Sequence, residues 1–521
     1  MNGRGRLGPV KALCVAVSLA LALSACGSPG SNTGSEEDQS LTLYEIGIYA
    51  SLDPAHPTND DSFSVRGLLA LYDRIIHLTP DGDLQPGLAT EWKFTDTKLQ
   101  EFEFTLRKDA QFQDGTPVDS KAIVANLERL KGLGEKTSKT VKAAADLVKS
   151  VEAIDDQRVR ISLSAPDGGF AYRLAGQAGM MVSPEAINAD GTAEAVGAGP
   201  FSLEKFVPNE QVLLEPFMKY WDGKAGERPS ELDIKTSSDA QARLNAVISG
   251  EADVALIEPS QVKAAESANL KVQSNPLLSF WLFYTNLSDE MKDVRVRQAI
   301  SHAIDREAIA NNLTSGTGAA TEQLYPEGSP LFIDELKGRF NHDPERARKL
   351  LAEAGFADGV DLTLMVVNFP EQQQMSQALQ TQLAEAGIRV TFVVVDISQF
   401  QRFVDGETDM YTARWGGRAD PLITMELLTS EDGTYTPGDT ASPALDKLIQ
   451  QAKGLEAGSE ERMKVLREAH KEIIEQMAVI PIVTRVNLYA YRDGCITGLN
   501  KYVGFGADDW RDVRRGDGCA N

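Results

Sequence analysis

Residues 362–367 read Leu-Thr-Leu-Met-Val-Val, a short apolar run that is typical of a buried strand. The chain next predicts a helix from about Glu371 to Ala386, which ends at Gly387. A second apolar run, Val-Thr-Phe-Val-Val-Val, follows at 390–395. A strand, a helix and a strand at this spacing predict a right-handed βαβ unit, and therefore a parallel sheet of the α/β class.

Local signals on the N-terminal side of this unit extend the pattern. Residues 343–354 begin with Asp-Pro, an N-cap followed by a proline at the first helical position, and predict a helix. Residues 102–106 alternate apolar and polar side chains, which predicts a half-buried strand, and Asp-Gly at 114–115 predicts a turn. Asp119 is expected to cap a helix that runs to about Leu130. The N-terminal region is therefore predicted to be mixed α+β.

The first residues have the layout of a secretory signal peptide. Basic residues precede an apolar run at 12–23, which is too short to span a bilayer comfortably. The run ends in Leu23-Ser24-Ala25-Cys26, which resembles a bacterial lipobox. The resemblance implies that residues 1–25 are removed and that the thiol of Cys26 carries a diacylglycerol, which anchors the protein to a membrane. The alternative is a plain secretory signal cleaved after Ala25.

Length and charge limit the possibilities for the chain beyond the leader. Residues 26–40 are predicted to form a flexible tether, because after Cys26 they hold no apolar side chain to bury. The remaining chain exceeds the size at which single cores stop growing, so at least two lobes are expected. Of the 521 residues, 76 are acidic and 52 basic, a net charge of −24. This charge argues against a nucleic-acid partner, which would need a basic patch.

Two cysteines remain once the leader is removed and Cys26 is lipidated. They are Cys495 and Cys519, and a pair of cysteines in an exported protein is interpreted as a disulfide. A metal site is the competing interpretation, but two thiols without a nearby histidine offer too few ligands.

A series of short motifs occurs in order along the mature chain. They are Ser51-Leu52-Asp53-Pro54, Leu71-Tyr72-Asp73-Arg74-Ile75, residues 84–92, residues 104–107 with 112–117, Gly197-Ala198-Gly199-Pro200-Phe201, residues 293–306, and residues 343–355. In this order they resemble the family 5 extracellular solute-binding proteins of ATP-driven importers, a family that includes oligopeptide- and dipeptide-binding proteins. The resemblance extends from residue 51 to about residue 485.

The resemblance implies an α/β, two-lobe fold of the periplasmic-binding-protein type (type II, cluster C-like), with an extra α+β subdomain in the N-terminal lobe. The expected bounds are 41–278 with 487–521 for lobe I, about 76–196 for the subdomain inside it, and 279–486 for lobe II. Two crossover strands, expected at 279–286 and 482–487, join the lobes, and the ligand is enclosed between them. Most of the motifs are interpreted as structural. Asp305 is expected to cap a helix, and Gly199-Pro200 to set a turn.

The segment 414–421 is the most informative about cargo. It reads Arg-Trp-Gly-Gly-Arg-Ala-Asp-Pro and resembles the family's Trp-x-x-Asp-x-x-Asp/Glu-Pro loop, whose first Asp pairs with the α-ammonium in peptide-binding members. This loop is one residue shorter, and Arg418 stands third after Trp415. Two interpretations stay open: Asp420 takes the amine contact, or it caps the next helix while Arg418 binds a carboxylate, which its forked donors match. Gly416-Gly417 permits close backbone approach or an unusual turn.

Other candidate cargo contacts come from the crossover strands and from an N-terminal wall of the cleft. Trp281 and Tyr284 either stack on a ligand or serve as core and rim aromatics. Asn286 and Arg485 belong to the same two strands. His56, which follows the Leu-Asp-Pro segment, is expected on another wall.

Nothing in the sequence has the pattern of a catalytic centre. The 5 histidines are scattered, and no His-Glu-x-x-His, Gly-x-Ser-x-Gly or P-loop motif occurs. We therefore expect a binding protein with no cofactor and no metal of its own, rather than an enzyme. An exported hydrolase is the alternative from a different class.

The predicted function is that of an extracytoplasmic lipoprotein, anchored through Cys26 to the outer face of the cytoplasmic membrane. It is expected to act as a monomer, to capture short peptides by lobe closure, and to deliver them to the permease subunits of an ABC transporter. The alternative keeps the importer role and changes the cargo to a carboxylate-bearing solute, a glutathione-like peptide, a sugar or a metal chelate.

Overall fold

The computed structural model places the predicted βαβ unit at one edge of a ten-stranded sheet. The unit consists of β13 (Val360–Val367), α10 (Pro370–Glu385) and β14 (Ile388–Val395), and its two strands pair in parallel. Successive side chains of β13 alternate between two cores: Leu362 and Leu364 pack on one face, and Met365 and Val367 on the other. The sequence prediction of this unit is confirmed to within two residues at each boundary.

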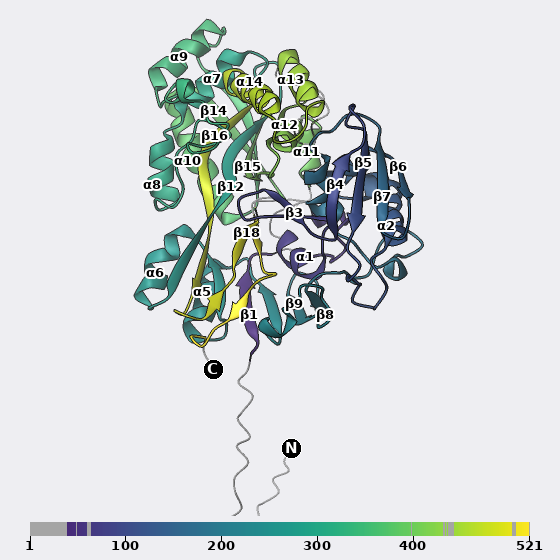
Figure 1. The fold of residues 1–521 in the computed structure, drawn as a ribbon. Helices are drawn as coiled ribbons and strands as arrows, with labels where there is room; N and C mark the ends of the chain where they lie inside the picture. The colour runs from purple at the N-terminus through teal and green to yellow at the C-terminus, as the bar shows by residue number, and fades with distance from the viewer. Residues whose placement is uncertain are drawn as a thin grey trace, which may run out of the picture. The chain divides into compact units, whose positions relative to one another are not determined.

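The sheet runs in the order β14-β13-β15-β12-β16-β11-β1-β10-β9-β8. Its other strands are β15 (Met410–Gly416), β12 (Lys271–Thr285), β16 (Val479–Tyr491), β11 (Val254–Ile257), β1 (Leu41–Glu45), β10 (Leu232–Thr236), β9 (Gln211–Pro216) and β8 (Phe201–Val207). The long strands β12 and β16 are antiparallel neighbours in the middle of the sheet (Figure 1). They cover the two predicted crossover strands except Asn286 and extend beyond the predicted bounds, because the ladder continues through polar residues of β12 such as Gln273 and Asn275 and reaches Tyr491 of β16.

The structure describes residues 39–47, 49–59, 64–396, 399–430, 433, 435, 442–502 and 507–519. The predicted leader, Cys26 and the predicted tether up to Asp38 lie outside these residues. Residues from Gln39 onward form one compact unit. Within the described residues, no helix combines the length and the apolar character needed to cross a membrane.

A break in the ladder divides the sheet into two halves. The pairing of β12 with β16 shifts register between Pro276 and Phe280. We call the part with β14, β13, β15 and the adjoining segments 280–285 and 479–484 the β14 half. The part with β11, β1, β10, β9, β8 and the segments 271–276 and 486–491 is the β8 half. Arg485 lies at the break between them.

Helices cover both faces of the β14 half. Side chains of α7 (Val294–Ala303), α8 (Arg306–Leu313), α9 (Pro344–Glu353) and α10 form the core on one face. Side chains of α12 (Pro421–Thr429), α13 (Pro443–Lys453) and most of α14 (Glu460–Gln476) form the core on the other, beside the short helix α11 (Gln401–Val404). Strands β13 and β15 are therefore mostly buried on both faces, whereas the edge strand β14 is partly exposed.

The β8 half packs against α1 (Val65–Leu71), α5 (Ala240–Ser249) and α6 (Val262–Ser267). A separate four-stranded antiparallel sheet, which we call the small sheet, has the order β4-β5-β7-β6. Its strands and helices are β4 (Ala89–Phe94), β5 (Glu101–Leu106), β6 (Val148–Ala153), β7 (Arg158–Leu163), α2 (Ser120–Leu133), α3 (Lys139–Ala145) and α4 (Phe170–Leu174). These elements lie within the range predicted for the extra subdomain.

Short pieces complete the described fold. Three two-stranded sheets are formed by β2 (Ile76–Leu78) with β3 (Leu84–Pro86), β17 (Ile496–Thr497) with β20 (Arg514–Arg515), and β18 (Asn500–Tyr502) with β19 (Ala507–Asp509). The 3-10 helices are η1 (Pro57–Asn59), η2 (Gly134–Lys136), η3 (Gln177–Gly179), η4 (Pro184–Ala186), η5 (Ala225–Glu227), η6 (Pro259–Gln261) and η7 (Asp334–Leu336).

The capping predictions are confirmed at three helices. The side chains of Asp119, Asp305 and Asp343 accept hydrogen bonds from the backbone N–H groups of Ala122, Ala308 and Arg346 at 2.9, 2.9 and 2.8 Å. Gly199 also has a structural role, because a Cβ atom there would lie 2.4 Å from the backbone carbon of Leu71.

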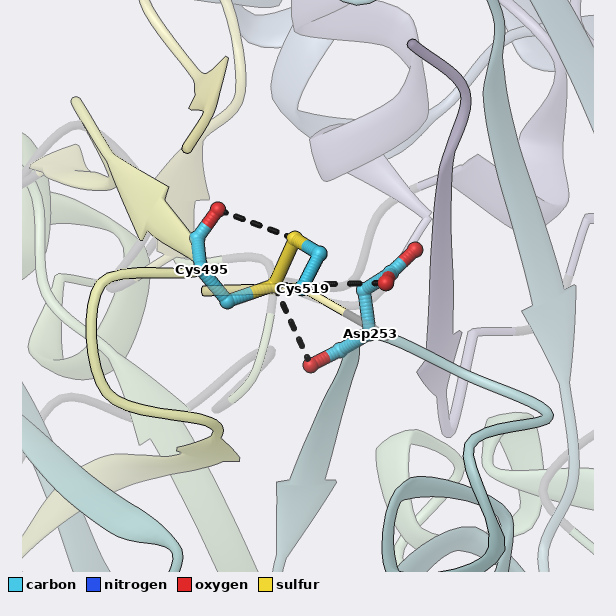
Figure 2. A group of neighbouring side chains, drawn as sticks. All are labelled: Asp253, Cys495 and Cys519. Atoms are coloured by element: carbon cyan, nitrogen blue, oxygen red, sulfur yellow. Dashed lines mark hydrogen bonds between the residues drawn. A yellow bond between two sulfur atoms is a disulfide. The ribbon is translucent and has the colours of Figure 1, made fainter. Parts of the chain in front are cut away.

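Cys495 and Cys519 are joined by a disulfide in the structure (Figure 2). Asp253 lies beside it, with Oδ1 at 3.9 Å from the Cys495 sulfur, and its Oδ2 accepts a hydrogen bond from the backbone of Thr42. Because both sulfurs are consumed in the bond, this group offers no thiolate to a metal. Its effect is to tie the segment that contains β18 and β19 to the β8 half.

Asp508, on β19, connects the C-terminal segment to both long strands. Its buried carboxylate accepts hydrogen bonds from Asn275 of β12 at 2.7 Å, from Tyr489 of β16 at 2.7 Å, and from the side chain of Asn487. Asn275 and Asn487 face each other in the ladder, one pair before the last rung that precedes the register break. The guanidinium of Arg66 lies 3.8 Å away, and it is also paired with Glu45 at 3.0 Å, so the two carboxylates share this cation.

We predict that Asp508→Ala destabilises the protein by about 3–5 kcal/mol, because three polar groups lose their acceptor in a buried site and Arg66 keeps only the carboxylate of Glu45, 3.0 Å away. Urea unfolding of the two proteins measures this difference. Asp361→Ala is the matched control, because that carboxylate is exposed and its ion pair with Arg389 is expected to contribute at most about 1 kcal/mol. Equal losses in the two variants would show that the Asp508 contacts are energetically unimportant.

Candidate functional site

Two crevices open where the halves of the structure meet. The first, which we call the small-sheet crevice, lies between α3, α4 and η3 on one side and residues 418–427 on the other. The second, the hinge crevice, is lined by the ends of β1 and β11, by α8 and α10, and by β12, β15 and β16 near the register break. The hinge crevice encloses about 680 Å³ of empty space, part of it open to solvent.

Trp415 is buried in the core of the β14 half, 3% exposed. Its ring meets that of Tyr435 edge-on at 5.3 Å between centroids. The Arg418 guanidinium also contacts the Trp415 ring and lies 4.8 Å from its centre. Trp415 therefore supports the loop by packing in the core, and it is not among the residues that line either crevice.

Arg418 lines the small-sheet crevice and reaches across it. Its guanidinium donates to the carbonyl of Gly416 and, at 3.4 Å, to the hydroxyl of Thr140 on α3. Its backbone N–H donates to the Thr424 hydroxyl at 3.0 Å. The loop through Gly417 is thus folded back on itself, and the Arg418 charge is directed at the small-sheet side.

Asp420 also lines the small-sheet crevice, but its carboxylate is already occupied. It accepts a hydrogen bond from the Leu422 N–H as the cap of α12, and it forms a two-pronged ion pair with Arg462 at 2.9 and 2.7 Å. The exposed fraction of Asp420 is 1%. These contacts favour the capping interpretation over the amine contact.

Trp281 and Arg485 come together in the hinge crevice, with a partner that the sequence analysis did not select. The guanidinium groups of Arg485 and Arg414 lie 5.6 and 5.8 Å from the centre of the Trp281 ring. Arg414 faces Trp281 because the two residues are opposite each other in the pairing of β15 with β12. The position of Arg414 opposite Trp281 is the observation that identifies it as part of the hinge crevice.

Two carboxylates complete the hinge crevice, and both were missed by the sequence analysis. Glu371, at the start of α10, lies 3.2 Å from Arg414 and 4.0 Å from Arg485. Glu258, at the end of β11, pairs with Arg243 at 3.1 Å. Burial, followed by the like charge of Glu371, raises the pKa of Glu258. Neither residue lies in a recognisable motif, because the group is assembled from separate elements.

Three predicted contacts lie elsewhere among the described residues. Tyr284 is 3% exposed and packs against Phe403 and Tyr411 in the core. Asn286 donates to the backbone carbonyls of Phe403 and Thr408 at 2.8 and 2.7 Å. His56 bonds to the Thr58 hydroxyl through Nδ1 at 2.8 Å. None of the three is among the residues that line the two crevices, and their contacts favour structural roles.

A set of contacts closes the small-sheet crevice along one side. Arg173 of α4 pairs with Glu426 of α12 at 2.6 Å, and Lys453 pairs with the same carboxylate at 2.6 Å. The backbone of Gly168 exchanges hydrogen bonds with Lys453 and Ala457 at 2.9 and 3.1 Å. A Cβ atom at Gly168 would lie 2.0 Å from the Leu455 carbonyl oxygen, so only glycine permits this approach. These contacts join α4 and its preceding loop directly to the β14 half.

The family model described as "Bacterial extracellular solute-binding proteins, family 5 Middle" matches residues 83–436. The match spans more than half of the chain, and the chain therefore belongs to this family. It is an extracytoplasmic solute-binding protein of an ABC importer, and it is not an enzyme.

Curated relatives match over most of their length. The chain is 26% identical over 477 residues to the probable D,D-dipeptide-binding periplasmic protein DdpA of Escherichia coli K12, covering 87% of this chain and 88% of the relative. It is 27% identical over 481 residues to the glutathione-binding protein GsiB of Salmonella paratyphi A, covering 88% and 92%.

The fold is also similar to that of solved structures. The binding protein AgaA of A. tumefaciens R10, in complex with agropinic acid, superposes with a TM-score of 0.78 at 24% identity, over 91% of this chain and 98% of that one. The expected α/β periplasmic-binding-protein fold, with its additional small antiparallel sheet, is confirmed. The named cargoes of these three proteins differ, so the fold alone leaves the cargo open.

We predict that Asp420→Ala destabilises the protein by about 3–5 kcal/mol, because it leaves Arg462 buried without a partner and removes the α12 cap. Urea unfolding of Asp420→Ala, Arg462→Ala and the double variant measures the coupling between the two side chains. Removing the second partner is expected to cost much less than removing the first. Strictly additive losses would mean that the pair is not coupled.

We predict that Glu426→Gln lowers the unfolding free energy by about 3 kcal/mol at neutral pH. Burial by itself raises the pKa of Glu426, but the charges of Arg173 and Lys453 outweigh it and lower the pKa to about 2. The stabilisation is therefore complete above the pKa of an unfolded glutamate, about 4.3, and is lost as the pH falls toward 2. Unfolding measured from pH 3 to 8 in both proteins tests this.

The control for this pH series is Glu407→Gln, whose ion pair with Arg402 is exposed. That variant should differ little from the native protein at any pH. A difference between Glu426→Gln and the native protein that grows as the pH falls would contradict the assigned direction.

Proposed function

We propose that this chain captures short peptides between the two halves of its sheet and delivers them to the permease subunits of an ABC transporter. The observation that carries the proposal is the charge pattern of the hinge crevice. Glu258 enters it from the β8 half, whereas Glu371 and Arg414 enter it from the β14 half, with Arg485 at the break between them. A short peptide carries an ammonium and a carboxylate, and these groups complement a crevice with charges of both signs.

Capture is proposed to proceed by closure of the halves about the register break. In this proposal the β8 half together with the small sheet is lobe I, and the β14 half is lobe II. A solute in the hinge crevice touches both, so it binds the closed form better than the open one and shifts the population toward closure. The contacts of Arg173 and Gly168 along the small-sheet crevice would then belong to the closed form.

Two of the named cargoes support a peptide. DdpA is named for a D,D-dipeptide and GsiB for glutathione, which is itself a tripeptide. The agropinic acid complex of AgaA supports the alternative of a carboxylate-bearing solute that is not a peptide. Arg418, in the small-sheet crevice, is the proposed contact for such an anion.

The membrane attachment is part of the same proposal. Cys26 is proposed to carry the lipid, and residues 27–40 to link it to the compact unit that begins at Gln39. A receptor on such a tether stays close to its permease, which raises the local concentration for docking.

We predict that a soluble form that begins at residue 27 is stabilised by a pool of di- to hexapeptides in thermal unfolding. A ligand at 1,000-fold its dissociation constant adds about 4 kcal/mol, which raises the midpoint by several degrees. Parallel samples contain sugars, free amino acids, organic acids or metal chelates. A shift with one of these and none with peptides would disprove the peptide cargo and leave the importer role intact.

A second pool, acetylated at the peptide N-termini, serves as the control for the ammonium group. If Glu258 and Glu371 receive the ammonium, the acetylated pool gives a smaller shift than the free pool at equal concentration. Equal shifts would show that the carboxylates of the hinge crevice do not bind the ammonium group of the peptide.

A further inference from the structure

The hinge crevice contains one cation whose charge is poorly compensated. Arg485 is largely buried, with 17% of its side chain exposed. Its guanidinium makes no hydrogen bond to any described residue, and its nearest carboxylate, Glu371, lies 4.0 Å away. Burial lowers the pKa of Arg485, which is the sign of a cation removed from water without full replacement. Such a group is stabilised when an anion joins it.

The surrounding charges leave room for that anion. Glu371 lies 3.2 Å from Arg414 and 4.0 Å from Arg485, so Arg414 is its closer partner. The other carboxylate of the crevice, Glu258, is engaged by a third cation, Arg243.

Trp281 gives the two guanidinium groups of the crevice a defined geometry. Both guanidinium groups lie near its ring, at 5.6 and 5.8 Å from the centre, and all three side chains belong to residues that line the crevice. Arg414 also lies 5.5 Å from the ring of Phe369. Aromatic neighbours restrict the positions of the two forks and exclude water on one side, which favours a planar anion that accepts hydrogen bonds in pairs.

We propose that the hinge crevice binds the carboxylate of the solute at Arg485 and Arg414, against Trp281. The inference rests on the proposed function, because it names the group of the cargo that this site selects. The inference also distinguishes between the two candidate contacts for an anion, Arg418 and Arg485. Arg418 is held by the Gly416 carbonyl and by Thr140, whereas Arg485 has no such hydrogen bonds within the described chain.

The test compares acids with their neutral analogues by isothermal titration calorimetry. The probes are di-, tri- and tetra-alanine with a free C-terminus, the same peptides as C-terminal amides, succinate, and dimethyl succinate. The native protein, from residue 27 onward, should bind the acids about 30-fold more tightly than the amides. Arg485→Gln should abolish this preference by weakening the acids alone.

Two further variants keep the result interpretable. Arg485→Lys retains the charge without the fork, so it should weaken the acids less than Arg485→Gln does and leave the amides unchanged. It also decides the question if Arg485→Gln fails to fold. Arg389→Gln, on an exposed ion pair with Asp361, is the matched control and should keep the full preference for acids.

The outcomes distinguish this inference from the proposed function. If Arg485→Gln keeps the preference for acids, or if Arg418→Gln is the variant that abolishes it, the inference is overturned while peptide binding stands. If no peptide binds, the proposed cargo is wrong, and succinate decides the inference. Succinate binding that is absent from the ester and from Arg485→Gln supports the site. Succinate that does not bind, or that binds Arg485→Gln equally well, rejects it.

Discussion

Asp508 accepts hydrogen bonds from Asn275 of β12 and from Asn487 of β16, which face each other one pair before the last rung that precedes the register shift of these strands. Both long strands are thereby fixed to the β8 half at the place where the β14 half begins. The position of the hinge crevice depends on this anchor, because Arg485 and Trp281 lie within a few residues of it on the same strands. If the anchor were lost, the strands could slide or twist, and side chains that meet across them would no longer share one crevice. A buried carboxylate surrounded by amide and phenol donors resists this, because a shift would leave several polar groups unpaired.

Charge serves different purposes in the two crevices. In the small-sheet crevice, the ion pairs of Asp420 with Arg462 and of Glu426 with Arg173 are buried and closely matched, so they shape the structure. In the hinge crevice, Glu371 is shared between two arginines at unequal distances, and the group stays partly open. The contrast follows from burial: a charge taken fully out of water needs a close partner, whereas one at the edge of a cleft can accept a partner that comes and goes.

The βαβ unit and the capping aspartates were predictable, because each depends on a few neighbouring residues. The apolar run at 362–367, the helix after it and the cap at Asp343 carry their own signals. The full length of β12 was not predictable from its apolar run, because Lys271 and Asn275 belong to it through pairing with β16 and through Asp508. Of the site, the sequence indicated Trp281 and Arg485, but not Glu258 or Glu371. These residues are brought together from four elements, and no local pattern marks a residue whose partners are remote in the chain. Tyr284 and Asn286 had a plausible position along a crossover strand, but they lie beyond the segment that faces the crevice.

The order of the strands has a consequence for how the protein reaches its native state. β16 is the last strand of the large sheet in the chain, yet it lies between β12 and β11 near the middle. Until its residues have emerged, β12 and β11 each have an unpaired edge, and the anchor at Asp508 comes later still. A chain that is still passing through a translocation channel therefore cannot complete the sheet, and its halves stay separate and incompletely paired. For a protein that crosses a membrane as an unfolded chain, this delay is useful, because the sheet cannot close before the passage is almost finished. The same delay leaves sheet edges open to wrong partners, which makes the export step the period of greatest aggregation risk.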